Sequence, residues 1–138
     1  MIALNGRPID PPVVKGYATI TRKWKRGDKI ELQLPMLAQR IVASDKIEAT
    51  RGRTALRYGP LVYNVERVDQ DISRAIDPKA PLSVAWKPDL LEGVMAIEGR
   101  WVDGERLLAI PNYARCNREE NAGGRSGPSS VVWIRVDQ

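Results

Sequence analysis

The sequence predicts an all-β protein, an antiparallel β-sandwich of jelly-roll type with little or no helix. Apolar and polar residues alternate with a period of two over residues 29–34, which is typical of a half-buried strand. Eleven glycines and ten prolines punctuate the chain, and no window has the capped, amphipathic pattern of a helix. With 138 residues, 43% hydrophobic and 28% charged, we expect a single sandwich domain over residues 1–138.

The first predicted element is a hairpin. Residues 17–22 alternate with β-branched side chains, and residues 30–34 form the half-buried strand. Between them, residues 25–28 supply a turn in which Gly27 can adopt a positive φ.

A kink or bulge and a further hairpin turn are expected in the middle of the chain. Residues 54–66 contain two short apolar runs around Gly59 and Pro60, and Pro60 lacks the N–H of an unbroken ladder, so we expect a kink or bulge there. Asp103 and Gly104 lie between two apolar segments. That pattern predicts a hairpin with a two-residue type I′ turn.

Residues 131–136 predict a last strand that closes the sheet. Residues 119–130 are rich in Gly and Ser and predict a flexible surface loop. A second irregular stretch, residues 69–82, contains Pro78 and Pro81.

Charge and hydropathy exclude several partners. The net charge is +5, but the one basic cluster is confined to residues 22–26 and the other cations are interspersed with acids, so we expect no nucleic-acid partner. No apolar run approaches the ~20 residues of a membrane span, and the first residues lack the pattern of a signal peptide. We therefore expect neither a signal peptide in this chain nor a membrane partner. These patterns leave the compartment open, with the cytoplasm slightly favoured.

The residue inventory restricts chemistry. The chain has no His and one Cys, which excludes zinc and haem sites as well as Ser and Cys nucleophiles that need a His base. Asp69 and Asp71 form an Asp-x-Asp pair without the remaining ligands of a calcium loop. We therefore expect no catalytic residue, no metal site and no cofactor.

Cys116 allows two interpretations. Arg115 and Arg118 flank it, and cationic neighbours favour a reactive thiolate. The strand-like pattern of residues 113–117 instead favours a small apolar filler, which is the commoner role of an isolated Cys.

Aromatic side chains are the candidates for carbohydrate binding, because the apolar face of a sugar ring lies flat on Trp or Tyr. The candidates are Trp86, Trp101, Tyr113 and Trp24. The chain has no Phe, so these rings are also the large fillers available to a core or an interface, and that role is favoured. Trp24, beside a basic turn, is expected to be partly exposed.

Taken together, these segments resemble the C-terminal region of glycoside hydrolase family 127, a family that includes bacterial β-L-arabinofuranosidases. The resemblance follows the family's order over nearly the whole chain, in residues 4–8, 16–28, 34–36, 57–66, 86–94, 109–118 and 132–134. Arg115 and Cys116 stand where the family's usual Tyr-Ala-Trp-Ala-Asn-Arg pattern has Trp and Ala.

The resemblance implies a parent enzyme in which a helical barrel holds the catalytic site and β-sandwich domains pack on that barrel and take part in dimerisation. It implies hydrolysis of L-arabinofuranosides by a zinc-bound cysteine nucleophile and glutamates, all in the barrel. None of those residues has a counterpart here, and Cys116 falls in the late sandwich motif. We therefore expect a non-catalytic accessory module, not an enzyme by itself.

A sandwich that normally packs on another domain leaves an interface of ~600 Å² or more uncovered when it is alone. We expect the helical-barrel catalytic domain of the parent, or self-association into a dimer, to cover this surface. The alternative function is a carbohydrate-binding module for arabinose-containing glycans.

Overall fold

The protein forms two compact units, Met1–Pro35 and Met36–Gln138, where a single domain over residues 1–138 was expected. The computed structural model describes residues 1–118 and 129–137. Most of the expected loop at 119–130 therefore lies outside the described residues. The expected all-β antiparallel class is confirmed, since the helical residues described are two three-residue 3-10 turns, η1 (Glu48–Thr50) and η2 (Asn112–Ala114). Within these described ranges, no helix is long and apolar enough to span a bilayer.

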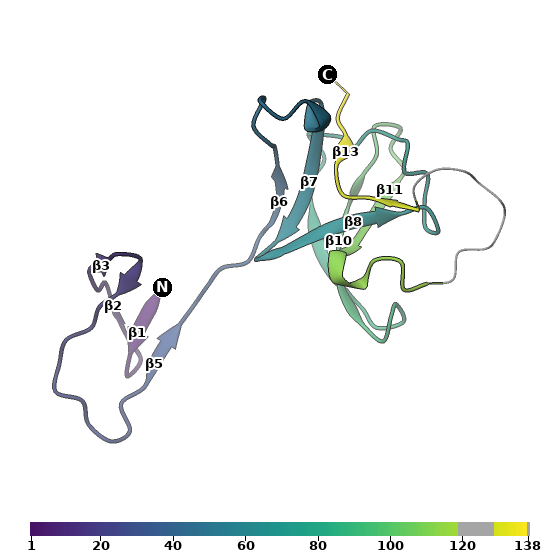
Figure 1. Ribbon diagram of the computed structural model, residues 1–138. Helices are drawn as coiled ribbons and strands as arrows, with labels where there is room; N and C mark the ends of the chain where they lie inside the picture. The colour runs from purple at the N-terminus through teal and green to yellow at the C-terminus, as the bar shows by residue number, and fades with distance from the viewer. Residues whose placement is uncertain (119–128, 138) are drawn as a thin grey trace. The chain divides into compact units, whose positions relative to one another are not determined.

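The first unit consists of two small antiparallel sheets (Figure 1). One has the order β2-β1-β5, formed by Arg7–Ile9, Ile2–Leu4 and Ile30–Leu32, and the other pairs β3 (Val13–Val14) with β4 (Tyr17–Ala18). The expected hairpin between residues 17–22 and 30–34 is thus wrong, because β4 pairs with β3 and β5 pairs with β1.

Asn5 explains this different pairing. It occupies the β1–β2 turn with φ +51° and is followed by Gly6 at φ +76°, as a type I′ turn requires. The side-chain amide of Asn5 donates to Asp28 Oδ1 at 2.9 Å, and its carbonyl oxygen accepts from the backbone N–H of Lys29 at 2.8 Å. These two bonds hold β5 beside β1, and the paired residues of the two strands, from Leu4 with Ile30 to Ile2 with Leu32, lie far apart in sequence.

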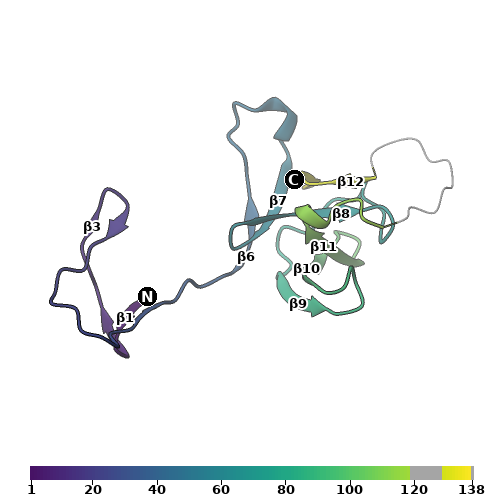
Figure 2. The same cartoon turned by 60° about the horizontal axis from the view of Figure 1, so that its bottom comes forward.

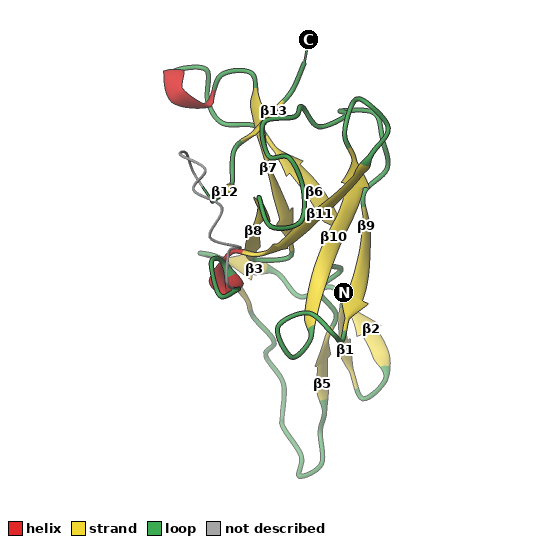
Figure 3. Ribbon diagram, turned by 90° about the vertical axis from the view of Figure 1, so that its right-hand side faces the viewer, coloured by secondary structure: helices red, strands yellow, loops and turns green. Residues whose placement is uncertain are grey.

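The second unit is one antiparallel sheet with the order β13-β7-β8-β11-β10-β9, to which β6 adds beside β7 and β12 beside β8. Figures 2 and 3 show β9, β10 and β11 side by side in this sheet. The strands are β6 (Ala38–Ile41), β7 (Arg53–Tyr58), β8 (Leu61–Glu66), β9 (Ser83–Lys87), β10 (Val94–Arg100), β11 (Arg106–Pro111), β12 (Ser130–Val131) and β13 (Ile134–Arg135).

Both mid-chain turns connect hairpins, although their geometry differs from the expectation. Gly59 and Pro60 are not a kink inside a strand but the turn between β7 and β8, because Tyr58 pairs with Leu61. Between β10 and β11, the amide of Gly104 donates to the carbonyl of Trp101 at 2.9 Å, and Gly104 takes φ +88°. Asp103 keeps a negative φ, so this turn is the longer type with a bulge at glycine instead of type I′.

The last segment makes two short strands instead of one. β12 pairs with β8, and β13 pairs with β7. The chain therefore changes partner between residues 131 and 134. The β7–β8 ladder runs only from the pair of Tyr58 with Leu61 to the pair of Leu56 with Tyr63, so Glu66 and Thr54 lie beyond it and pair with β12 and β13, respectively.

The core lies on one face of the curved sheet and is closed by the irregular stretch after β8. Ile76 donates its amide to the Arg135 carbonyl at 2.9 Å, and Val102 donates to the Ala75 carbonyl at 3.0 Å. This segment thus joins β13, at one end of the sheet order, to the loop after β10, as in a sandwich or half-barrel. The enclosed side chains are Leu56, Tyr63, Val65, Ile76, Ile97, Trp101, Leu107, Ala109 and Ile134.

Candidate functional site: an aromatic rim and a charged groove

The four aromatic candidates fall into three environments. Trp101 is 1% exposed and belongs to the core, so its proposed role in sugar binding is wrong. Trp24 lies in the first unit and is half exposed, as expected, with the Arg22 guanidinium 5.4 Å from its ring centroid. Trp86 and Tyr113 lie in the second unit and are 57% and 68% exposed.

Trp86 and Tyr113 both neighbour Gly93, and we call these three residues the aromatic rim. The Trp86 ring covers Gly93 so closely that a Cβ on Gly93 would overlap it. Gly93 also lines a hollow of about 290 Å³ together with Tyr113, Glu92 and Asn117. An exposed ring beside a carboxylate and an amide is a combination that can hold a sugar.

The backbone of the rim is conformationally restricted. Leu91, Glu92 and Gly93 all have positive φ, at +52°, +60° and +107°. Non-glycine residues adopt this region at a cost, so the surrounding packing must hold the turn. Leu90 and Leu91 pack on the small apolar cluster of Val94, Ile110 and Ala114, which provides that support.

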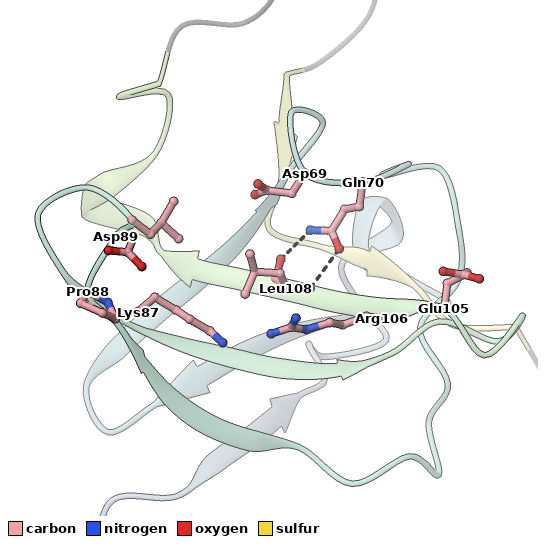
Figure 4. A pocket seen from close by; sticks show the side chains of 9 residues that line it. Asp69, Gln70, Lys87, Pro88, Asp89, Glu105, Arg106 and Leu108 are labelled. Atoms are coloured by element: carbon pink, nitrogen blue, oxygen red, sulfur yellow. Dashed lines mark hydrogen bonds between the residues drawn. The ribbon is translucent and has the colours of Figure 1, made fainter.

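A second concave feature, which we call the charged groove, runs along β11 on the face away from the core (Figure 4). It has a volume of about 540 Å³. It is lined by Asp69, Gln70, Lys87, Pro88, Asp89, Leu90, Glu105, Arg106 and Leu108.

Glu98 fixes the two cations of this groove. Its Oε1 forms one ion pair with Lys87 Nζ and another with Arg106 Nη2. The hydrogen bond from Lys87, reinforced by Arg106, lowers the pKa of the Glu98 carboxyl. Sequence reasoning missed this cluster, although strand alternation across the β10–β11 hairpin places Glu98 and Arg106 on one face once the register is known.

Gln70 fixes the opposite wall. Its side-chain amide donates to the Leu108 carbonyl at 2.5 Å, and its Oε1 accepts from the Leu108 N–H at 3.0 Å, as the dashed lines in Figure 4 show. The β8–β11 pairing includes only Ile110 and Pro111 of β11. At Leu108, therefore, the side-chain amide of Gln70 makes the two backbone hydrogen bonds that a neighbouring strand would otherwise make. A single glutamine in an irregular stretch gives no sequence signal for this role.

Arg118 joins the groove wall to the segment after β11. It donates to Glu66 Oε2 at 2.5 Å and to both oxygens of Asp69 at 2.6–2.7 Å. The bonds to Asp69, followed by those to Glu66, raise the pKa of the Arg118 guanidinium. Asp69, a member of the Asp-x-Asp pair, is thereby engaged as an ion-pair partner.

Cys116 is not the apolar filler that the sequence favoured. Residues 112–114 form the turn η2 instead of a strand, and Cys116 follows it with φ +58° and an exposed side chain. Its Sγ lies 3.4 Å from Ser129 Oγ, and its amide donates to Glu66 Oε1 at 2.6 Å. The positive φ and the exposure both follow from this tight turn back to β8.

The residues of this chain do not fit the zinc centre that the family resemblance implies for the parent enzyme. Zinc in such a site requires several Cys, His or carboxylate ligands within one coordination sphere. The chain has no His and a single Cys, and residues 1–118 and 129–137 contain no cluster of three potential ligands.

Sequence comparison identifies two family profiles along the chain. The profile described as the glycoside hydrolase family 127 C-terminal domain matches residues 38–134. The profile described as the GH127 middle domain of β-L-arabinofuranosidase matches residues 1–36. The boundary between the two matches coincides with the division between the two structural units. No curated protein sequence matches the chain significantly.

Solved structures agree with this assignment. A GH127 β-arabinofuranosidase superposes with a TM-score of 0.84 at 30% identity, over 99% of this chain and 23% of its own. A GH127 β-L-arabinofuranosidase from Geobacillus stearothermophilus T6 gives 0.84 at 33%, over 99% and 24%. A further glycoside hydrolase shares the fold, with a TM-score of 0.82 at 23% identity over 99% and 26%. The chain thus spans about a quarter of these relatives' length, and it belongs to glycoside hydrolase family 127.

Proposed function

We propose that this chain is a non-catalytic accessory part of a family 127-like hydrolase, which supports the catalytic part and mediates association. The parent activity would be that of a β-L-arabinofuranosidase, the activity named for two of its structural relatives. The observation that carries this proposal is the uncovered apolar surface of the first unit.

That surface is large for so small a unit. Val13, Tyr17, Leu32 and Leu34 are between 62% and 76% exposed, whereas Ala3 is the buried hydrophobic residue that this unit contributes. Units of this size rarely bury enough surface to be stable alone. Exposed apolar strands of this kind mark an interaction surface, and a further part of a GH127 enzyme or a second copy of this chain would cover it.

The test is the association state of the purified chain. We expect an apolar dye to bind and light scattering to show a mass above that of the monomer. Leu32→Lys together with Val13→Lys should reduce both, whereas the control Val102→Lys, at an exposed apolar position of the second unit, should change neither. A monomer at high micromolar concentration that binds no dye would contradict the proposal.

A second candidate function is glycan binding at the aromatic rim. It is favoured by the exposure of Trp86, which covers Gly93, and of Tyr113, which lines one hollow with Gly93 and Glu92. Titration with arabino-oligosaccharides should then quench the fluorescence of Trp86, and Trp86→Phe should abolish that signal. Unchanged fluorescence at millimolar sugar would contradict binding at the aromatic rim.

A further inference from the structure

We propose that the charged groove binds the hydroxyl groups of a neutral sugar chain. This site is separate from the aromatic rim, and the proposal does not depend on the accessory role. It rests on the distribution of charge in the groove, on the apolar residues of its lining and on the hydrogen bonds and ion pairs that hold its side chains in place.

Charge of both signs is displayed along the groove. Figure 4 shows Lys87 and Arg106 pointing toward each other, with Asp89 near one end and Glu105 near the other. Asp89 and Glu105 are exposed and have no ion-pair partner among the described residues. The groove therefore offers charged donors in its middle and free carboxylate acceptors at its ends.

This arrangement selects against charged ligands. An anion drawn to Lys87 and Arg106 meets their common counter-ion, Glu98, and the carboxylates at both ends. A cation drawn to those carboxylates meets Lys87 and Arg106 between them. A hydroxyl group carries no net charge, and it both donates and accepts hydrogen bonds, so vicinal hydroxyls can use both kinds of partner at once.

Donor capacity remains after the internal ion pairs are made. Lys87 and Arg106 each direct one nitrogen to the same oxygen of Glu98. An ammonium carries three N–H groups and a guanidinium five, so both cations keep N–H groups for a ligand. Charge-assisted hydrogen bonds of this type are the stronger ones.

The apolar lining, the volume and the fixed wall of the groove are also suited to a sugar. Leu108, Leu90 and Pro88 are the apolar residues of the groove lining, and they offer surface on which the C–H face of a sugar ring can lie. The volume of about 540 Å³ lies within the ~300–1,000 Å³ typical of small-ligand sites. Gln70 is bonded twice to the Leu108 backbone, so this wall is formed before a ligand arrives.

The proposal is tested by amide NMR titration of the whole chain with three probes. These are a neutral arabino-oligosaccharide, an anionic oligogalacturonate and a cationic glucosamine oligomer. We expect the neutral probe to shift the amides of Gln70, Arg106 and Leu108, and to bind more tightly than either charged probe. Absence of shifts at these amides up to millimolar neutral sugar would overturn the proposal, as would preferential binding of the anion or cation.

Substitutions then locate the site. Arg106→Ala and Asp89→Ala should each weaken binding about tenfold, because each removes a charged hydrogen-bonding group. The control Arg115→Ala, at an exposed arginine outside the groove, should leave binding unchanged. Loss of binding in Trp86→Ala, with Arg106→Ala unaffected, would assign the sugar to the aromatic rim and overturn the groove proposal. The association experiment tests the accessory role independently of this outcome.

Discussion

Replacement of Arg118 by Met tests how the segment after β11 is held to the sheet. Arg118 donates to Glu66 and Asp69, whose side chains are 5% and 20% exposed. After the substitution, the Glu66 carboxylate keeps the Cys116 N–H as its hydrogen-bond donor and is otherwise buried without compensation. The decrease in the free energy of unfolding should therefore be large for the replacement of one partly exposed arginine.

The size of this decrease can be worked out from how deeply the ion-paired side chains are buried. Removing one partner of a fully buried ion pair costs about 3–5 kcal/mol. Arg118 is 18% exposed and Asp69 can turn to solvent, so we expect about 2–3 kcal/mol. With a urea m-value of about 1–3 kcal/mol/M, the unfolding midpoint should fall by about 0.7–3 M.

The control is Arg135→Met, because Arg135 pairs with Asp137 where both side chains are more than half exposed. It should change stability by less than about 0.5 kcal/mol. Adding Glu66→Gln to Arg118→Met should recover part of the lost stability, since the uncompensated charge is removed. A midpoint for Arg118→Met within error of that for Arg135→Met would refute this explanation.

Three further predictions concern the core, the rim and a tyrosine. Trp101→Ala should lower the free energy of unfolding by about 3–5 kcal/mol, and Trp86→Ala by under about 1 kcal/mol, in the same urea assay. Gly93→Ala should cost more than Gly104→Ala, because both have positive φ but only Gly93 would overlap the Trp86 ring; equal losses would contradict the packing. Burial, with Tyr113 and Tyr58 nearby, raises the pKa of Tyr63 from 10.0 to about 12. The unfolded state then ionises first, so Tyr63 contributes stability that is full below pH 10 and is lost as the pH rises toward about 12, a loss that Tyr63→Phe should diminish in alkaline unfolding measurements.

The sequence predicted the fold class because period-two alternation and turn residues are local signals. The β10–β11 hairpin joins neighbouring runs and was located correctly, whereas the β7–β8 hairpin was expected only as a kink or bulge at Gly59 and Pro60. The pairing of β5 with β1 was missed, because it depends on the long-range bonds of Asn5 to Asp28 and Lys29. The split of the last strand was missed because alternation does not reveal a change of partner.

The candidate sites were less predictable. Aromatic residues can be counted in a sequence, but only packing shows that Trp101 is buried and that Trp86 covers Gly93. The charged groove depends on strand register, which brings together Lys87, Glu98 and Arg106 from three strands. Single charges spaced along a chain look like ordinary surface residues until that register is known.

Hydrolysis of an aryl β-L-arabinofuranoside by the purified chain, with zinc and a reductant present, tests the central claim most directly. We predict no release of the aryl group above that in buffer, because the chain has no imidazole and a single thiol. Turnover at an enzymic rate, abolished by substitution of a side chain within this polypeptide, would contradict the claim that the chain is non-catalytic.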